Sequence, residues 1–404
     1  MYTPERDQAL ALDRDDPLAP FRERFVAPPE GVLYFDGNSL GQLPHATREA
    51  LHRAIDLEWG QRLIRSWTEG WMELPFSTGE MLGTHLLGAA PGQTVLADST
   101  TVNFYKLAAV ALAARPGRPR ILTDRANFPT DRYALESLAR HHDRQIDWLD
   151  APADGGPEPD AVESLLSERT ALVTFSHVAY RSAHLADMRR ITELAHAHGA
   201  LVLWDLSHSA GAVPLALDSD GVDLAVGCTY KYLNGGPGAP AFLYVSERLQ
   251  SELSQPIWGW IGRRDPFAMA AGYQAGDGIA RMLSGTPQVL GLTAAREGIA
   301  LCAEATVAAI RAKSVALTDY AVALADALLA PRGVGLGSPR ESAARGGHVS
   351  LTHPDARRLA QRLIDADVIP DFREPDVIRI GLSPLTTRFA DVHEGLTRLQ
   401  TLLG

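Results

Sequence analysis

The chain has 404 residues, of which 46% are hydrophobic and 22% are charged. This composition is typical of a globular protein and excludes a fibrous repeat or a disordered chain, and the length favours a large domain with a smaller one beside it. The formal net charge of -11 at pH 7 argues against nucleic acid and against an anionic membrane as partners, because both repel an acidic protein.

The first twenty residues include several acidic side chains and lack the apolar core of a signal peptide. The longest apolar run, 107–114, is shorter than the roughly 20 residues that a membrane helix needs. Only two cysteines occur, Cys228 and Cys302, which are too few for a disulfide framework and lack the spacing of a zinc site. We therefore expect a cytoplasmic protein that binds no metal ion.

From about residue 94, short runs rich in β-branched residues alternate with amphipathic stretches. This alternation predicts βα units that build a mostly parallel sheet. The runs predicted as strands are 94–98, 120–124, 171–178, 200–205 and 223–228.

The segment 187–199 is predicted to be the helix of a βαβ crossover between the third and fourth of these strands. Its apolar residues recur on one helical face. Asp187 can cap its first turn and Gly199 can end it.

The C-terminal part follows a different pattern. The alanine-rich segment 292–329 predicts one long helix or a pair of helices. Two predicted strands, 348–353 and 377–383, then alternate with two predicted helices, 355–367 and 389–403. This order favours a second, smaller α+β domain.

Lys231 follows the strand 223–228 and precedes a glycine-rich turn. Asp205 ends the strand 200–205, and His208 lies three residues further on. Ligands of open α/β sheets bind at the carboxyl edge of the strands, so these three side chains are expected to reach one crevice. A lone Asp and Lys would equally well form a structural ion pair, so the interpretation depends on what surrounds them.

Two loops add further groups to this edge. Thr100 and Thr101 open a helix directly after a strand, where hydroxyls and backbone N–H groups can hold a phosphate, although such residues are also common helix caps. In the loop 126–135, Phe128 can stack on a planar ring and Asp131 can bond near it, although a phenylalanine is often simply a core residue.

Pyridoxal phosphate requires this combination of groups. A lysine forms the covalent link to the cofactor, a carboxylate keeps the pyridine nitrogen protonated so that the ring accepts electrons, and hydroxyls hold the phosphate. Asp205 beside a pyridinium is favourable, because each charge stabilises the other. The sequence therefore predicts a pyridoxal phosphate site around Lys231.

The motifs around this site resemble the fold-type I pyridoxal phosphate enzymes of the class V aminotransferase group, in which a strand ending in Asp-x-x-His precedes a Thr-Tyr-Lys segment and a glycine-rich turn. Within that group, seven motifs between about residues 32 and 390 are similar to the kynureninase family, of the bacterial type. In chain order they read YFDGNSLGQLP, SWTEGW, NFPTDRY, WDLSHSAGAVP, CTYKYLNGGPGAPAFLYV, GWIG and IRIGLSPLTTRF.

The resemblance implies an α/β fold with a mostly parallel central sheet, flanking helices and a smaller α+β domain. We predict a large domain for the cofactor at 61–295 and a small C-terminal domain at 296–404. The segment 1–60 is predicted to contribute to the small domain and to dimer contacts.

By this resemblance, Lys231 binds the cofactor and then moves the substrate Cα proton, and Asp205 pairs with the pyridine nitrogen. The resemblance also implies a homodimer with shared active sites, in which Trp258 and Thr286 reach in from the other subunit. Ser176 matches a further cofactor contact, although a hydroxyl at a strand end needs no such role. The residues implied to bind the cofactor are Thr100, Thr101, Phe128, Asp131, Ser176, Asp205, His208, Tyr230, Lys231, Trp258 and Thr286.

Arg379 is implied to bind the substrate α-carboxylate, because a guanidinium grips a carboxylate through two hydrogen bonds; without the resemblance, an arginine at a strand end is usually solvated. Asn38 is implied at the entrance of the site, or is simply a turn residue. Trp67, Gly285 and Thr286 are implied to shape the pocket for the aromatic ring, which then suits L-kynurenine better than 3-hydroxykynurenine and leaves the latter open as a substrate.

The implied reaction is hydrolysis of the Cβ–Cγ bond of L-kynurenine to anthranilate and L-alanine, a step of tryptophan degradation. Lys231, Tyr230 and Asp205 are the expected catalytic residues, with Tyr230 as the acid-base group for carbonyl hydration and Cβ protonation. An aminotransferase or a cysteine desulfurase of the same group stays open as an alternative, as does a non-catalytic protein of this fold. A desulfurase needs an exposed reactive cysteine, which neither Cys228 nor Cys302 resembles.

One segment departs from the family pattern. Residues 177–188 read HVAYRSAHLADM, with Ala179 where the resemblance implies an asparagine and Ala183 where it implies a glycine. A lost amide and a lost flexible position are expected to alter the loop, and with it the kinetics or the substrate preference.

Overall fold

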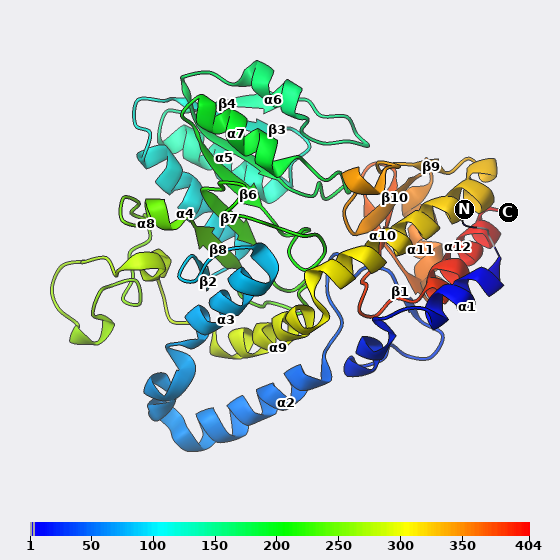
Figure 1. The fold of residues 1–404 in the computed structure, drawn as a ribbon, viewed down its shortest axis with the longest axis horizontal. Coiled ribbons are helices and arrows are strands. Elements are labelled where there is room, and N and C mark those ends of the chain that lie inside the picture. The colour runs from blue at the N-terminus through cyan, green and yellow to red at the C-terminus, as the bar shows by residue number, and fades with distance from the viewer. Residues whose placement is uncertain (1, 3–4) are drawn as a thin grey trace.

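A seven-stranded sheet forms the centre of the larger part of the protein (Figure 1). The structure is a computed structural model, and it describes residue 2 and residues 5–404. Neighbouring strands run parallel except at β8, which is antiparallel to both β7 and β2. Across the sheet the strands are β2 (Thr94–Leu96), β8 (Phe242–Val245), β7 (Leu224–Gly227), β6 (Leu201–Asp205), β5 (Thr170–Ser176), β3 (Arg120–Asp124) and β4 (Gln145–Leu149).

The predicted, mostly parallel sheet is therefore confirmed, and the five predicted strands lie within two residues of their expected ends. The sequence reading misses β4 and β8. Strand β4 is an edge strand with mostly half-buried residues, so it lacks the apolar run that marked the others.

Both faces of this sheet are covered, because side chains alternate along each strand. Leu201 and Leu203 belong to one apolar core, which they share with α4 (Thr100–Ala113) and α5 (Pro129–His141). Val202 and Trp204 belong to the opposite core, which they share with α7 (Met188–Ala197) and α9 (Val289–Ala305).

Helix α7 confirms the predicted crossover between the parallel neighbours β5 and β6. The side chain of Asp187 accepts a hydrogen bond from the backbone N–H of Arg190, as a capping residue does. Gly199 adopts a φ of +73° directly after the helix, a conformation that ends helices and favours glycine.

The alanine-rich segment is a pair of helices, α9 and α10 (Val307–Leu324), separated at Thr306, whose φ is 65°. By length and hydropathy alone, Val307–Arg332 would suffice to cross a membrane, but half of its most apolar window is buried inside the protein. Several residues of α10 belong to the C-terminal core, so it has the surroundings of a core helix.

The smaller part is built on a four-stranded antiparallel sheet in the order β12 (Asp371–Arg373), β13 (Val377–Gly381), β10 (His348–Thr352) and β9 (Gly335–Leu336). Its core includes residues of α10, α11 (Ala356–Asp365) and α12 (Phe389–Leu403). These strands and helices lie where the sequence predicts an α+β unit.

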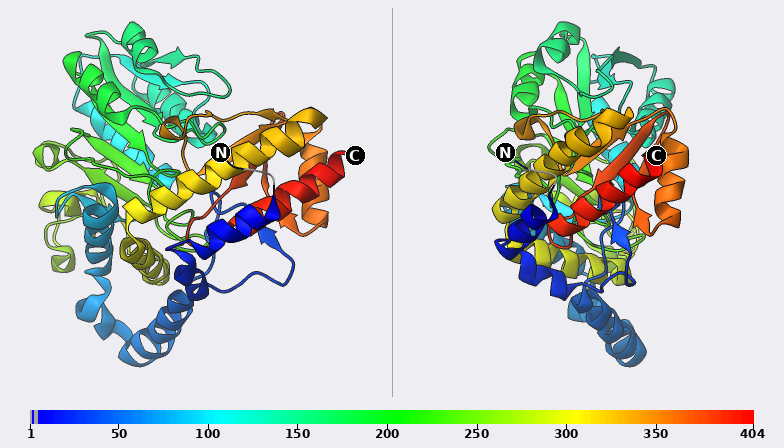
Figure 2. Two further views of the ribbon diagram at one scale, coloured as in Figure 1. Left: turned by 45° about the vertical axis from the view of Figure 1, so that its right-hand side comes forward. Right: turned by 90° about the vertical axis from the view of Figure 1, so that its right-hand side faces the viewer.

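The larger part, built on the seven-stranded sheet, and the smaller part, built on the four-stranded sheet, form two bodies. The N-terminal segment packs partly against each of them. Helix α1 (Arg6–Arg14) lies beside α12 (Figure 2), and β1 (Leu33–Tyr34) pairs in parallel with β11 (Val368–Ile369). Helices α2 (His45–Arg53) and α3 (Leu74–Leu82) pack against α9 instead. Helix α9 crosses the predicted boundary at residue 295 and joins the larger core, so the exact division into domains remains a prediction.

A tight loop after β5 joins the two bodies. Val178 and Leu185 close it by an antiparallel bridge, and Ala183 between them has a φ of 64°. The Ala183 carbonyl accepts a hydrogen bond of 2.7 Å from the N–H of Gly346, and Arg181 forms an ion pair of 2.7 Å with Asp376. The loop with the two departures from the family pattern is thus a connection between the bodies, and an alanine occupies a left-handed position.

The left-handed φ of Ala183 generates a prediction. Ala183→Gly is expected to raise the free energy of unfolding by up to about 1 kcal/mol, because an L-residue is strained in this conformation and glycine is not. Ala179→Gly is the matched control and is expected to lower it by about 0.5–1 kcal/mol through the entropy of the unfolded chain. Urea unfolding measures both, and a destabilised Ala183→Gly variant would contradict the assignment of strain.

Candidate active site

Lys231 lies in the turn after β7, at the carboxyl edge of the large sheet. Its Nζ atom is 2.9 Å from Nε2 of His208 and lies 5.8 Å from the centre of the Phe128 ring. Burial lowers the pKa of His208 well below its usual value, with a further contribution from the charge of Lys231. The structure therefore brings together three of the predicted residues, with a neutral imidazole against the amine.

The two other lysines of the chain are already occupied. Lys106 is fully buried, with Nζ at 2.6 Å from Asp98 and 2.9 Å from the carbonyl of Met282. Lys313 is buried in an ion pair of 2.7 Å with Asp16. Of the three lysines, Lys231 alone combines partial exposure with an imidazole and an aromatic ring.

Buried carboxyl groups gather beside this amine. Asp205 ends β6 and accepts a hydrogen bond of 2.8 Å from the N–H of Ser207. Asp131, in the first turn of α5, faces Asp205, and burial together with that neighbouring carboxylate raises the pKa of Asp131 well above its usual value. Asp124, at the end of β3, raises it further, while Lys231 opposes the effect.

This cluster fits the cofactor that the sequence predicts. Two adjacent buried carboxyl groups are stabilised by a positive charge between or beside them, and Oδ2 of Asp131 makes no hydrogen bond to any residue that the structure describes. A protonated pyridine nitrogen supplies that charge. Asp131 and Asp205 would therefore hold the ring nitrogen.

Asn127 organises the loop that carries Phe128, and the sequence analysis overlooked it. Its Oδ1 atom accepts hydrogen bonds from Oγ of Ser176 at 2.7 Å and from the N–H of Phe128 at 2.8 Å. Phe128 also packs edge-on against Tyr180, with ring centres 5.3 Å apart. Asn127 directly precedes Phe128 in the motif NFPTDRY, and this position could have indicated a role in holding the loop. Ser176, which was predicted to contact the cofactor, thus holds the loop in place through its hydrogen bond to Asn127 in this structure.

The predicted phosphate-binding groups lie around the start of α4. Thr100 and Thr101 are its first two residues and are partly or fully exposed, and Ser99 before them caps the helix through the N–H of Val102. Tyr230 precedes Lys231 and is half-buried; burial raises its pKa, and the neighbouring thiol of Cys228 adds to the shift. Its phenol therefore stays protonated at neutral pH.

Arg379 is not solvated, so the solvated alternative is wrong. It lies on β13 with 1% of its surface exposed, and its guanidinium donates to the carbonyl of Tyr180 at 2.6 Å and to Oγ of Ser39 at 3.0 Å. Asp371 pairs with it directly. Among the described residues, Nε of Arg379 has no hydrogen-bond partner, so this N–H group remains for a ligand. Ser39, Tyr180 and Asp371 were not predicted.

Asn38 lies in a turn, as its alternative reading proposed, but it is fully buried. It packs so closely on Gly381 that a Cβ atom at that glycine would lie 1.8 Å from Oδ1 of Asn38. This contact places Asn38 next to the strand that carries Arg379. No described residue satisfies its amide nitrogen or oxygen.

Four predicted residues lie on two extensions of the chain, 54–73 and 254–288 (Figure 1). Trp67 packs edge-on against Trp71. Trp258 is 61% exposed and stacks on Tyr273. Gly285 and Thr286 are also exposed. In the hydrogen bonds and ring contacts of the described residues, none of the four meets Lys231, so a single chain does not bring these residues to the amine.

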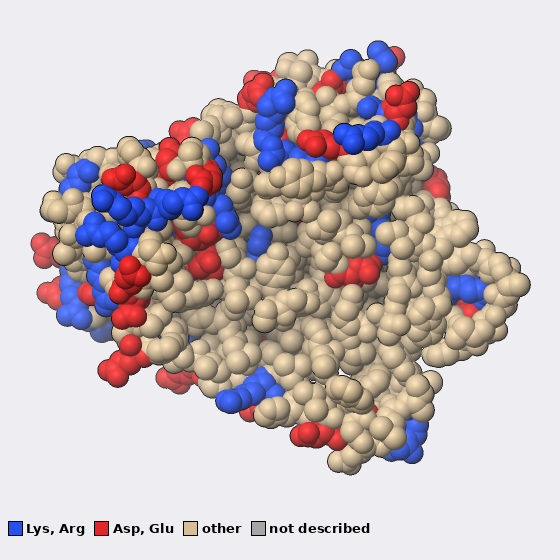
Figure 3. All heavy atoms as spheres, turned by 180° about the vertical axis from the view of Figure 1, so that it is seen from behind, with Lys and Arg blue, Asp and Glu red and all other residues tan. Residues whose placement is uncertain are grey.

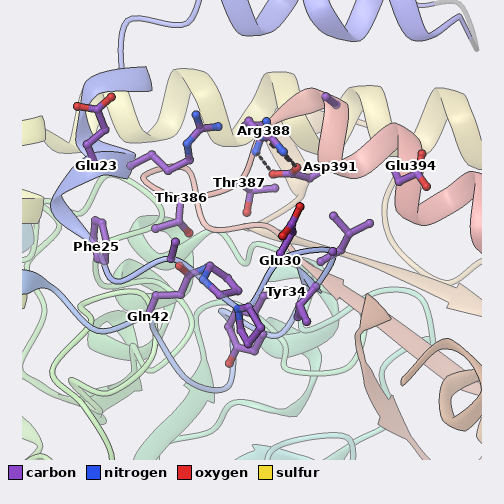
Figure 4. A pocket seen from close by; sticks show the side chains of 18 of the residues that line it. Glu23, Phe25, Glu30, Tyr34, Gln42, Thr386, Thr387, Arg388, Asp391 and Glu394 are labelled. Carbon is purple, nitrogen blue, oxygen red and sulfur yellow. Dashed lines mark hydrogen bonds and ion pairs between the residues drawn. The ribbon is translucent and has the colours of Figure 1, made fainter. Parts of the chain in front are cut away.

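A separate cavity of about 770 Å³ lies between the N-terminal segment and the start of α12 (Figure 4). Its lining includes Phe25, Gln42, Thr386 and Arg388. Lys231 and Asp205 are not part of that lining, so this cavity is not the predicted cofactor site.

A cluster of three or more potential metal ligands is absent from residue 2 and residues 5–404.

Both cysteines are buried. Burial raises the pKa of Cys302 to about 12 and also raises that of Cys228. A desulfurase requires an accessible thiol that ionises readily. Neither cysteine has the surroundings that this alternative needs.

Comparisons with known proteins agree with these features. A family model described as the kynureninase C-terminal domain matches residues 310–399. Kynureninases from Burkholderia pseudomallei and Pseudomonas fluorescens are 45% and 43% identical to the chain, and each alignment covers 98% of this chain and 95% of the relative.

Solved structures show the same fold. An apo cysteine desulfurase from Thermococcus onnurineus and a mutant of C-DES with glycine covalently linked to its PLP cofactor both align with a TM-score of 0.80. Each is 18% identical to the chain, and the alignments cover 98% of this chain and 98% and 99% of those proteins. At this identity, they establish the fold alone.

The buried acids generate a prediction about pH. Burial raises the pKa of Asp124 to about 7, against the opposing effects of neighbouring backbone N–H groups and Arg132. The unfolded carboxyl ionises near pH 4, so from there to about pH 7 only the folded state keeps its proton. Relative to Asp124→Asn, the wild-type free energy of unfolding should therefore fall across this window, by at most about 1.4 kcal/mol per pH unit.

Urea unfolding of the wild type and of Asp124→Asn between about pH 4 and pH 8 measures this difference. It should become constant above about pH 7, where both states of the wild type are ionised. A difference that does not change with pH would show that Asp124 titrates normally in the folded protein.

Proposed function

The chain belongs to the kynureninase family, and from this membership we propose which of its residues perform the reaction. The protein is an enzyme, a hydrolase that depends on pyridoxal phosphate and cleaves the Cβ–Cγ bond of L-kynurenine to give anthranilate and L-alanine. The observation that carries the assignment of residues is the contact of the Lys231 amine with His208 and Phe128, beside the Asp131–Asp205 pair.

Lys231 would hold the cofactor covalently, Asp205 and Asp131 would hold its ring nitrogen, and Phe128 would lie against its ring. Thr100, Thr101 and Tyr230 would hold its phosphate at the start of α4. When bound, pyridoxal phosphate supplies an electron sink that makes the substrate Cα acidic and activates Cβ. Ser176 supports this site through Asn127.

Lys231 takes the Cα proton of the substrate. A base at this position must give up its charge, and the neighbouring His208 ring, kept neutral by burial, accepts a hydrogen bond from Nζ and holds the amine beside Phe128. General acid-base catalysis by a positioned group is worth roughly 10²- to 10⁴-fold in rate.

Tyr230 donates the proton that completes the cleavage. Its raised pKa keeps the phenol protonated, which suits a group that first polarises the substrate carbonyl for attack by water and then protonates Cβ. Its backbone carbonyl accepts a hydrogen bond of 2.8 Å from Gly41, which ties the catalytic turn to the N-terminal segment.

Arg379 binds the α-carboxylate of the substrate. Tyr180, Ser39 and Asp371 fix its guanidinium, so its remaining donor is presented in one orientation and little entropy is lost on binding. Asn38 lies at the same strand through Gly381. The substrate therefore sits where the two bodies meet, with its amino-acid end at the small sheet.

The enzyme works as a homodimer with shared sites. Figure 3 shows a broad face with few charged side chains, in contrast to the smaller part of the molecule. Large exposed hydrophobic residues are frequent in the two extensions, including Trp59, Ile64, Trp258 and Met269, and exposed apolar surface of this kind favours association. Through these extensions, Trp258 and Thr286 contact the partner's cofactor, and Trp67 and Gly285 shape its aromatic pocket.

The reaction places the enzyme in tryptophan degradation, and we assign it to the cytoplasm. Its pocket accepts L-kynurenine in preference to the 3-hydroxy form, as the resemblance of Trp67, Gly285 and Thr286 to the bacterial type implies.

The lysine assignment is tested by trapping the cofactor. Borohydride reduction followed by peptide mass spectrometry should place the cofactor on Lys231 and leave Lys106 and Lys313 unlabelled, because both are buried in ion pairs. Lys231→Ala should lose the visible absorbance of the bound cofactor and the release of anthranilate from kynurenine. A label on another lysine, or normal turnover by Lys231→Ala, would overturn the assignment.

The shared site is tested by mixing two inactive variants. Lys231→Ala and the double variant Trp258→Ala/Thr286→Ala each lack one half of every site in a homodimer. Co-expressed, they should recover about a quarter of wild-type activity, because half of the dimers are mixed and each mixed dimer has one intact site. If Trp258 and Thr286 served their own subunit, mixing would restore nothing.

A further inference from the structure

His348 lies on the face of the small sheet that carries Arg379. It opposes Gly381 in the pairing of β10 with β13, while Ser350 opposes Arg379. Side chains two positions apart on a strand share a face, so His348 and Arg379 are diagonal neighbours. The residues between them, such as Val349 and Ile380, point into the C-terminal core on the other face.

The His348 ring lies near both His208 and Arg379, which belong to opposite ends of the site. Its centre is 5.6 Å from that of His208, whose Nε2 lies 2.9 Å from the Lys231 amine. The backbone carbonyls of Tyr180 and Arg181 lie close enough to the ring to act as acceptors that raise its pKa against the larger effect of burial, but neither meets a ring nitrogen with the geometry of a hydrogen bond. His348 thus lies beside His208, which contacts the Lys231 amine, and beside Arg379, the residue assigned to the carboxylate.

Both ring nitrogens of His348 are unsatisfied. The residue is 0% exposed, and neither nitrogen makes a hydrogen bond to a residue that the structure describes. Leaving a buried polar group without a partner is costly, so such groups in native proteins usually await a ligand or an ordered water. The hydroxyl of Tyr232 and Nε of Arg379 are likewise buried and unpartnered in the described part of the chain.

These three groups are all donors. A Cβ atom at Gly347, the neighbour of His348, would lie 2.8 Å from the Tyr232 hydroxyl, which places that hydroxyl at the same end of β10. A carboxylate has about four lone-pair positions and no donor of its own. Buried groups that can donate, gathered near this end of β10, therefore suit a carboxylate better than the amine or the aryl ketone of the substrate.

We propose that His348 is a second residue that binds the substrate α-carboxylate, by donating its ring N–H beside Arg379. The inference rests on the proposed function, because it deepens the role assigned to Arg379. Burial and the charges of Arg379 and Lys231 hold the pKa of His348 well below its usual value. A neutral ring supplies one N–H donor and adds no charge to a site where Arg379 already provides one.

The test compares the holoenzyme with His348→Leu and His348→Gln. Three constants are measured: KM for L-kynurenine, and the inhibition constants of L-alanine, which has the carboxylate but no aryl group, and of 2-aminoacetophenone, which has the aryl ketone but no carboxylate. His348→Leu should raise the first two about ten- to a hundred-fold, the value of one hydrogen bond to a charged group. The constant for 2-aminoacetophenone and the cofactor content should not change.

His348→Gln should recover most of the lost affinity, because its amide also offers an N–H donor. Arg379→Lys should show the same selectivity between the two inhibitors as His348→Leu. His141→Leu, the same change at an exposed histidine of α5, should alter none of the constants. If His348→Leu does not fold, His348→Ala serves in the same measurements.

Equal weakening of both inhibitors, loss of the cofactor, or unchanged affinity for L-alanine would each overturn the proposal. Failure of the proposed function would appear differently, as a wild-type enzyme that releases no anthranilate. In that case, L-alanine binding, followed by the absorbance of the cofactor, still distinguishes the His348 variants from the wild type.

Discussion

The site depends on a balance of charge among groups that are mostly buried. Asp131 and Asp205 lie side by side at the carboxyl edge of the large sheet, with Asp124 near them and one amine, Lys231, to oppose their charge. Burial and a nearby like charge disfavour ionisation of a carboxyl group and so raise its pKa, as they do for Asp131. The cationic ring of pyridoxal phosphate, placed as proposed, would balance this charge, so these carboxyl groups suit that ring.

The parallel sheet explains why these groups meet. Strands β3 and β6 both end at the same edge, so the last residue of each, Asp124 and Asp205, points into the same crevice. Helix α5 begins at that edge and adds Asp131 in its first turn. His208, in the turn after β6, then meets Lys231. The site residues come from segments that are far apart in the sequence, and they meet because the parallel strands end at the same edge of the sheet.

The second half of the site belongs to the seam between the two bodies. The loop 177–186 bonds to residues 344–346 of the smaller part and offers the Tyr180 carbonyl to Arg379. The same face of the small sheet carries His348 and Arg379, and Ser39 of the N-terminal segment accepts a hydrogen bond from Arg379. The groups proposed to bind the amino-acid end of the substrate therefore have relative positions that depend on how the bodies pack. The departures at Ala179 and Ala183 fall within this connection.

Local patterns in the sequence determined much of this protein. Periodicity and capping residues predicted the crossover helix α7, and short apolar runs predicted five strands, because these depend on neighbours along the chain. Motif resemblance predicted the cofactor chemistry at Lys231. Only the tertiary structure decided that Arg379 is buried against Asp371, that Asp131 meets Asp205, and that His348 lies between His208 and Arg379. These contacts depend on strand register and on the packing of one body against the other, and a residue's neighbours along the chain carry no record of either.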